Sequence, residues 1–207
     1  FSFDWLGAVL LCAFLTSLIL FFNLGGKWGY LSARAAALAG AVILLLVSFI
    51  FQERRAAEPT VDLDLFKDRV FACANLSLGF MFFALGFYTF LMPFYLIDGL
   101  GYSAWHTGLT IAVVSVTTLV VAPVSGSLSD RIGTRLLCTA GISLICIALL
   151  LISRLDLQSS TADVVLRLVL FGVGSGLFQS PNNSSILGAA PRDRLGTASA
   201  MLATIRQ

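Results

Sequence analysis

Six long apolar runs dominate this sequence of 207 residues, and they limit what it can fold into more than any other feature. A run of roughly 17 or more apolar residues predicts a membrane-crossing helix, because a helix satisfies its own backbone polar groups in lipid. Composition agrees, since 58% of the residues are hydrophobic and 12% are charged, against about 45–50% and about 25% in soluble domains. We therefore predict an all-α, polytopic membrane protein with six full transmembrane helices and the start of a seventh near Gly196. The six predicted spans are residues 6–24, 35–51, 70–97, 107–128, 136–153 and 164–187.

Lysine and arginine residues are unevenly shared between the predicted loops. If the N-terminus of this segment lies in the cytoplasm, eight of them fall in cytoplasmic loops and three in outer loops. Cytoplasmic loops of membrane proteins carry the excess of these residues, so we expect this orientation. The longest polar segment, residues 53–69, is predicted to be an interfacial connector on the cytoplasmic membrane surface. It separates two helices in residues 1–52 from the helices in residues 70–207.

A short charged segment, GSLSDRIGTR, joins the fourth and fifth predicted spans. Its charges are Asp130, Arg131 and Arg135, and its expected flexible points are Gly126 and Gly133. A carboxylate near a helix N-terminus is stabilised by free N–H groups, and the arginines can pair with Asp130 or with lipid phosphate. Such a cluster can form in one arrangement of helices and break in another, as a gate requires. The alternative is a charged turn that only sets the topology.

Small and polar residues form stripes on the third, fourth and sixth predicted spans. At about 100° per residue, the members of each stripe share one helix face. They either pack helices together or line a water-accessible cavity, and both interpretations stay open. On the fourth span, the face with Ser115, Thr118 and Ala122 is interpreted as a packing face. The predicted cavity-lining residues are Asn75, Gly79 and Thr89 on the third span, Ser175, Gln179, Asn182 and Asn183 on the sixth, and Arg206 on the seventh.

Several kinds of site are not expected in this sequence. No aspartate or glutamate lies deep in a predicted span, so a coupling proton would need a carboxylate elsewhere. The four cysteines fall in apolar runs without metal-ligand spacing and are predicted to be small buried thiols. The one histidine, His106, is placed at the outer interface. We therefore predict no catalytic residue, no metal, no cofactor and no nucleic-acid partner.

Two other function classes fit the residues less well. A seven-helix receptor or photoreceptor is favoured by the number of spans alone. A retinal pigment needs a membrane lysine, whereas Lys27 and Lys67 lie in predicted loops. A membrane-embedded serine protease would need a base beside Ser175, and no histidine lies at that depth. The chain is therefore not expected to be an enzyme.

The charged turn and three further segments together resemble one transporter family. The spacing G-x-L-x-D-R-x-G-x-R resembles the loop signature of the major facilitator superfamily, with Thr134 where that family often has a basic residue. FDWLGAVLL, ERRAAEPTVDLDLFKDRVFACANL and GVGSGLFQSPNNSSILGAAPRDRLGTASAMLATIRQ resemble its fourteen-helix drug:proton antiporter branch, the EmrB/QacA type. In the superfamily this loop recurs in each six-helix half and is thought to latch the cytoplasmic side. The matching residues are Gly126, Leu128, Asp130, Arg131, Gly133 and Arg135.

The resemblance covers essentially the whole chain and implies a partial major-facilitator fold, in a fragment of a longer protein. Residues 1–52 would be two extra linking helices, and residues 70–207 the first five helices of the C-terminal six-helix bundle, the last one truncated. The implied function is proton-coupled efflux of amphipathic or cationic small molecules by alternating access, in a bacterial inner membrane. The implied partners are the lipid bilayer and the missing N-terminal half. The alternatives are an exporter of a siderophore, peptide or metabolite, or a non-functional remnant.

Overall fold

The computed structural model describes residues 5–53 and 63–206, which form two compact units, Phe1–Lys67 and Asp68–Gln207. Every regular element in the described ranges is helical, and six of the helices are long and apolar enough to cross a membrane. The predicted all-α fold with six full spans and a shorter seventh helix is therefore confirmed. The helices are α1 (Trp5–Trp28), α2 (Ala33–Glu53), α3 (Arg69–Phe94), α4 (Ala104–Ile132), α5 (Thr134–Ile152), α6 (Thr161–Ala189) and α7 (Leu195–Arg206).

The first unit is an antiparallel hairpin of α1 and α2. The chain reverses at Gly29, whose φ of 80° favours glycine. The Tyr30 ring folds back over Gly25 and meets Phe21 edge-on, with 5.9 Å between ring centroids. A short 3-10 turn, Leu63–Lys67, ends the unit. Most of the predicted interfacial connector, residues 54–62, lies outside the described residues.

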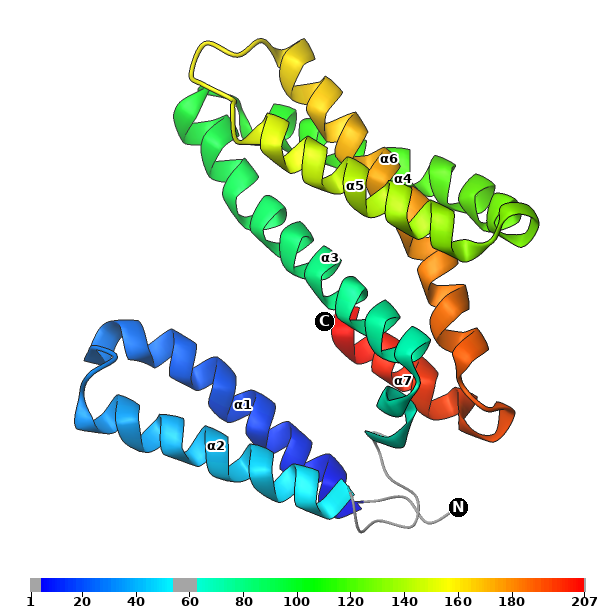
Figure 1. Ribbon diagram of the computed structural model, residues 1–207. Coiled ribbons are helices and arrows are strands. Elements are labelled where there is room, and N and C mark those ends of the chain that lie inside the picture. The colour runs from blue at the N-terminus through cyan, green and yellow to red at the C-terminus, as the bar shows by residue number, and fades with distance from the viewer. Residues whose placement is uncertain (1–4, 54–62, 207) are drawn as a thin grey trace. The chain divides into compact units, whose positions relative to one another are not determined.

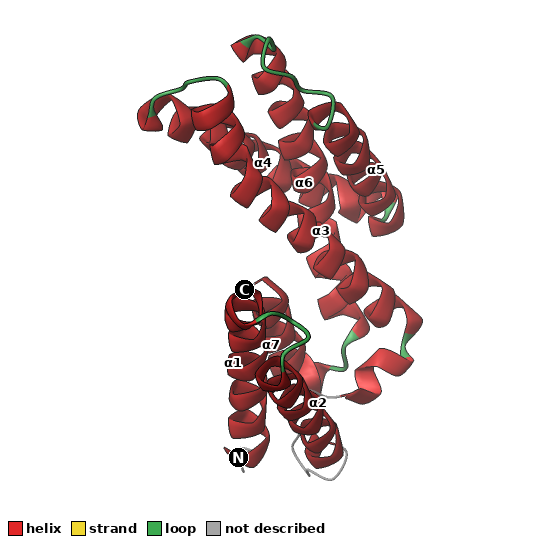
Figure 2. Cartoon of the chain, turned by 90° about the vertical axis from the view of Figure 1, so that its left-hand side faces the viewer, coloured by secondary structure: helices red, strands yellow, loops and turns green. Residues whose placement is uncertain are grey.

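In the second unit, α6 is the central helix (Figure 1, Figure 2). It lies between α4 and α5 and contacts each of the other four helices of the unit. Glycines allow this close approach. The carbonyl oxygen of Gly141 on α5 lies 2.9 Å from where a Cβ of Gly174 would stand, and Gly172 and Gly176 lie equally close to α4. Without a hydrophobic driving force in lipid, such small-residue contacts are what hold transmembrane helices together.

Hydroxyl groups of α4 add polar contacts across the same interface. The Thr118 hydroxyl donates to the carbonyl of Gly172 at 3.2 Å, and the Ser125 hydroxyl donates to the carbonyl of Leu177 at 2.9 Å. Each contact satisfies a polar side chain that lipid would leave without a partner. The α4–α6 pair is thereby fixed in both position and rotation.

The face of α3 that packs against α6 is not the face predicted from Gly79 and Thr89. Gly79 is only partly buried and Thr89 is exposed, and no atom lies within 4 Å of a Cβ added at Gly79. The contacts come instead from a neighbouring face of bulky residues. Tyr88 is buried and stacks on Phe171 of α6 with 5.2 Å between centroids. The buried apolar residues of α3 are Phe71, Ala74, Leu78, Met81, Tyr88 and Met92.

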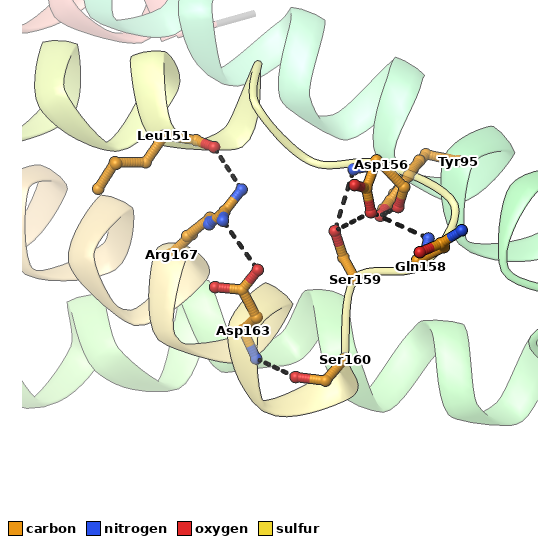
Figure 3. A network of polar contacts seen from close by, with 8 residues as sticks. All are labelled: Tyr95, Leu151, Asp156, Gln158, Ser159, Ser160, Asp163 and Arg167. Atoms are coloured by element: carbon orange, nitrogen blue, oxygen red, sulfur yellow. Dashed lines mark hydrogen bonds and ion pairs between the residues drawn. The ribbon is translucent and has the colours of Figure 1, made fainter.

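At the end of the unit opposite Gly133, α3 passes into a π-helical turn, Tyr95–Gly99, which begins two residues after Pro93. This turn is joined to the connection between α5 and α6. The Tyr95 hydroxyl donates to the carbonyl of Asp156 at 2.6 Å (Figure 3), and Tyr102 shares a hydrogen bond of 2.5 Å with Thr161. These contacts tie the start of α4 to the start of α6.

Arg167 links α6 to the end of α5 beside this network (Figure 3). Its guanidinium donates to the carbonyl of Leu151 at 2.6 Å and pairs with Asp163 at 2.8 Å. A cation is favourable at a helix C-terminus, where backbone carbonyls lack partners. These contacts support a structural role for Arg167.

We predict that Arg167→Ala destabilises the protein by about 1–2 kcal/mol. The carbonyl of Leu151 loses the guanidinium but keeps the backbone N–H of Arg154 at 3.1 Å, and Asp163 is 40% exposed, so water screens part of the ion pair. Arg154→Ala is the matched control, because Arg154 is an exposed arginine at the same end of the unit. Thermal unfolding of the two variants checks the prediction, and equal melting temperatures would contradict it.

The outer surface of the long helices is apolar. Exposed bulky residues occur on all six, as lipid contact requires, and examples are Phe22, Val47, Phe80, Leu119, Leu150 and Leu166. The prediction of buried thiols is wrong for this chain, since Cys12, Cys73 and Cys146 are exposed and Cys138 is half-buried. Cysteine is apolar enough to face lipid as well as a protein core.

Candidate functional site

A pocket of about 560 Å³ opens between α3, α4 and α6, and its size is typical of small-molecule sites. Apolar side chains make most of its wall, and hydroxyls and one amide supply the polar atoms. None of the side chains that line it is charged. The lining residues are Met81 and Leu85 on α3, Val114, Ser115, Thr118, Leu119, Ala122 and Pro123 on α4, and Ser175, Gln179 and Ser180 on α6.

Two of the predicted cavity-lining residues, Ser175 and Gln179, lie in this pocket. They are four residues apart on α6, which places them on one helix face. Ser175 is 2% exposed, and its Oγ has no hydrogen-bond partner among the described residues. Gln179 is half-buried, and its amide makes no hydrogen bond within the described ranges. Both side chains line the pocket with hydrogen-bonding groups that no described residue satisfies.

The other predicted residues of α6, Asn182 and Asn183, lie in its C-terminal half. The Asn182 amide donates to the carbonyl of Ala74 at 3.1 Å, which joins the two helices. Asn75 is buried on α3 and donates to the carbonyl of Phe71 at 2.8 Å. The Oδ1 atoms of Asn75 and Asn183 are buried without a partner among the described residues.

Arg206 was expected to face the protein interior, and the structure places it on the exposed surface of α7. The interior-facing residues of that short helix are apolar, namely Ala198, Met201 and Leu202.

The sequence did not lead us to predict that residues of α4 line the pocket. Ser115, Thr118 and Ala122 were interpreted as packing residues, and Thr118 does pack against α6 through its hydrogen bond. All three nevertheless line the pocket. The available signal was their spacing of three and four residues on a helix that is otherwise valine- and leucine-rich. Such spacing cannot tell a helix contact from a pocket wall.

The charged segment is not a loop of ten residues. α4 continues to Ile132 and α5 begins at Thr134, so Gly133 alone lies outside both helices, with φ 88° and ψ 152°. Gly126 is not a flexible point, because it lies inside α4 and faces Ser180 of α6, whose Oγ would stand 2.8 Å from an added Cβ. A single residue therefore joins α4 to α5, and α6 packs between the two helices beyond this turn.

The charges of this turn point away from the helix contacts. Asp130, Arg131 and Arg135 are exposed, and none of them forms an ion pair with another described residue. Asp130 lies in the last turn of α4, and no side chain caps the start of α5. The negative end of the α4 dipole disfavours a carboxylate at this position. The expected stabilisation by a helix N-terminus is therefore not observed.

The sequence of the whole chain, residues 1–207, matches the Major Facilitator Superfamily. The chain belongs to this superfamily. Its members are transporters, and this chain has the apolar helices of a multi-pass membrane protein.

Curated relatives of this superfamily member are bacterial transporters. The riboflavin transporter RibZ of Clostridioides difficile is 33% identical over 99% of the chain and 44% of the relative. The multidrug resistance protein Stp of Mycobacterium tuberculosis is 30% identical over 99% of the chain and 38% of the relative. The multidrug transporter protein MdtP of Bacillus subtilis is 29% identical over 94% and 36%. The chain thus spans less than half the length of these relatives.

Proposed function

We propose that the full-length protein is a proton-coupled exporter of amphipathic small molecules that works by alternating access. The observation that carries the proposal is the pocket between α3, α4 and α6, with its apolar wall and few polar groups. Transporters of this kind bind substrate at the interface of two structural repeats near the middle of the membrane. The names of Stp and MdtP favour multidrug efflux, and that of RibZ favours export or import of a metabolite.

The domain organisation that we propose is that of the fourteen-helix branch. The α1–α2 hairpin would be the extra linking pair, and its separation as a compact unit supports this. Helices α3 to α7 would be the first five of the C-terminal bundle, with the N-terminal half as their partner. The excess of lysine and arginine in alternate connections supports a cytoplasmic N-terminus in a bacterial inner membrane.

Proton coupling would require a carboxylate outside the helices described here. The acidic residues of the described ranges lie at helix ends or in connections, including Asp98, Asp130 and Asp163. A carboxylate deep in the membrane is the usual proton carrier in pumps and transporters. In this proposal, Asp130, Arg131 and Arg135 contribute instead to closing the cytoplasmic side.

Transport by the purified full-length protein in liposomes tests the proposal. An imposed pH gradient should drive accumulation of an amphipathic substrate, and a protonophore should abolish it. Accumulation that does not depend on the pH gradient would contradict proton coupling. Failure of every amphipathic compound, together with gradient-driven movement of a peptide or siderophore, would favour the alternative substrates.

A further inference from the structure

We propose that the pocket of α3, α4 and α6 recognises an uncharged hydrogen-bonding group of the substrate, with Ser175 and Gln179 as its polar contacts. The inference rests on the proposed transport function. It specifies which chemical group of a substrate the pocket of α3, α4 and α6 would bind. The group that fits best is an amide or imide edge, which presents an N–H and a C=O side by side. The apolar body of the substrate would lie against Met81, Leu85 and Val114.

Ser175 carries the first part of the argument. A helical serine can satisfy its hydroxyl by donating to the carbonyl four residues earlier. Ser185 on the same helix does this, at 3.0 Å from the carbonyl of Pro181, and Thr117 does the same to Val113 at 2.7 Å. Ser175 is 2% exposed, yet its buried Oγ has no such partner among the described residues. A buried polar group without a partner is rare and calls for a ligand or a water.

Gln179 supplies the complementary groups one helical turn away. Its amide offers two donors and an acceptor, and the serine hydroxyl offers a donor and an acceptor. Side chains at this spacing stand about 5–6 Å apart at their Cβ atoms, so both can reach one planar polar group. Thr118 is less available, because its hydroxyl proton is already donated to Gly172.

The charge of the pocket decides the substrate class. Its lining contains no acidic or basic side chain. A cationic group placed here would lose its hydration without gaining an opposite charge from this half of the site. An uncharged amide keeps its hydrogen bonds and loses little. A flexible Met81 beside the polar pair lets the apolar wall adapt to different ring shapes.

Binding to the purified full-length transporter in lipid nanodiscs tests the proposal. The probes are chloramphenicol and riboflavin, which are uncharged and carry amide or imide groups, and tetraphenylphosphonium, a cation without hydrogen-bonding groups. We expect Ser175→Ala and Gln179→Leu each to raise the Kd for the uncharged probe by about tenfold. The Kd for tetraphenylphosphonium should stay unchanged. Ser185→Ala is the matched control on α6, since its hydroxyl bonds its own helix.

Each outcome has one meaning. A higher Kd for the uncharged probe, with an unchanged Kd for tetraphenylphosphonium, supports the proposal. Equal weakening of both probes, or binding of the cation alone by the unmodified protein, overturns it while the proposed transport function stands. A protein that binds none of the probes and moves no substrate along a pH gradient overturns the proposed function and this inference with it. Unchanged melting temperatures of both variants establish that the fold is intact.

Discussion

Gly141→Leu should leave little folded protein. A Cβ at this position would stand 2.7 Å from the backbone nitrogen of Phe178 and 2.8 Å from the carbonyl oxygen of Gly174. Backbone atoms cannot rotate away as a side chain can, so α5 and α6 would have to separate along their whole contact. Overpacking alone costs about 1–3 kcal/mol, and a leucine also breaks the close contact at Gly174.

The loss should be severe because native proteins are stable by only about 5–15 kcal/mol. Fluorescence-detected size exclusion and thermal unfolding of the full-length protein give the measurement. Gly108→Leu is the matched control, since Gly108 is exposed on α4 and no atom lies within 4 Å of an added Cβ. Gly141→Ala should fall between the two. If Gly141→Leu and Gly108→Leu give the same yield and melting temperature, the close contact of α5 and α6 does not exist in the membrane.

Asp130→Asn should lower transport by about tenfold or more without lowering stability. The carboxylate lies at the unfavourable end of the α4 dipole and pairs with no other described residue, so its removal relieves a small repulsion. If Asp130 pairs with the other half of the transporter in one conformation, the substitution removes a charge-assisted hydrogen bond of about 1.5–3 kcal/mol. A change of about 1.4 kcal/mol shifts a conformational equilibrium tenfold.

The two readouts of Asp130→Asn must be measured on the same preparation. Efflux or gradient-driven uptake gives the transport rate, and thermal unfolding gives the stability. Asp98→Asn serves as the control, because Asp98 is an exposed aspartate at the opposite end of the unit. Unchanged transport would show that the charged turn only sets topology.

Hydropathy predicted all six spans, and the helices extend beyond most of the predicted limits. The sixth span was predicted as residues 164–187, and α6 runs Thr161–Ala189. Hydropathy indicates where the chain leaves the lipid core. A helix ends instead where its terminal backbone groups are bonded by a partner outside the helix. At α6 that partner is Ser160, whose hydroxyl accepts from the backbone N–H of Asp163 at 3.2 Å.

The rotation of α3 could not be predicted from its small residues. Gly79 and Gly86 resemble the glycines that pack α6, but they face open space in this chain. A glycine permits close approach without requiring it, and the partner helix decides whether the space is used. The bulky face with Leu78 and Tyr88 gains more contact area against α6, so it is the buried one.

Only part of the pocket could be predicted from the sequence, because its polar residues do not all stand out equally. Ser175 and Gln179 stand out on α6 because polar side chains are costly in a membrane. Ser115 and Thr118 stand out less, since a hydroxyl can bond its own helix or a neighbouring one. Only the position of α4 against α6 shows that this face serves both packing and the pocket.

The single-residue turn at Gly133 has a mechanical consequence. With both neighbours helical, the link between α4 and α5 is too short to absorb a sliding motion of one helix past the other. Helices α4 and α5 must therefore move together, so any displacement of the α4 wall of the pocket is transmitted to α5. At the opposite end, the hydrogen bonds from Tyr95 to Asp156 and from Arg167 to Leu151 join the π-helical turn, α5 and α6, so the displacement reaches α6 as well.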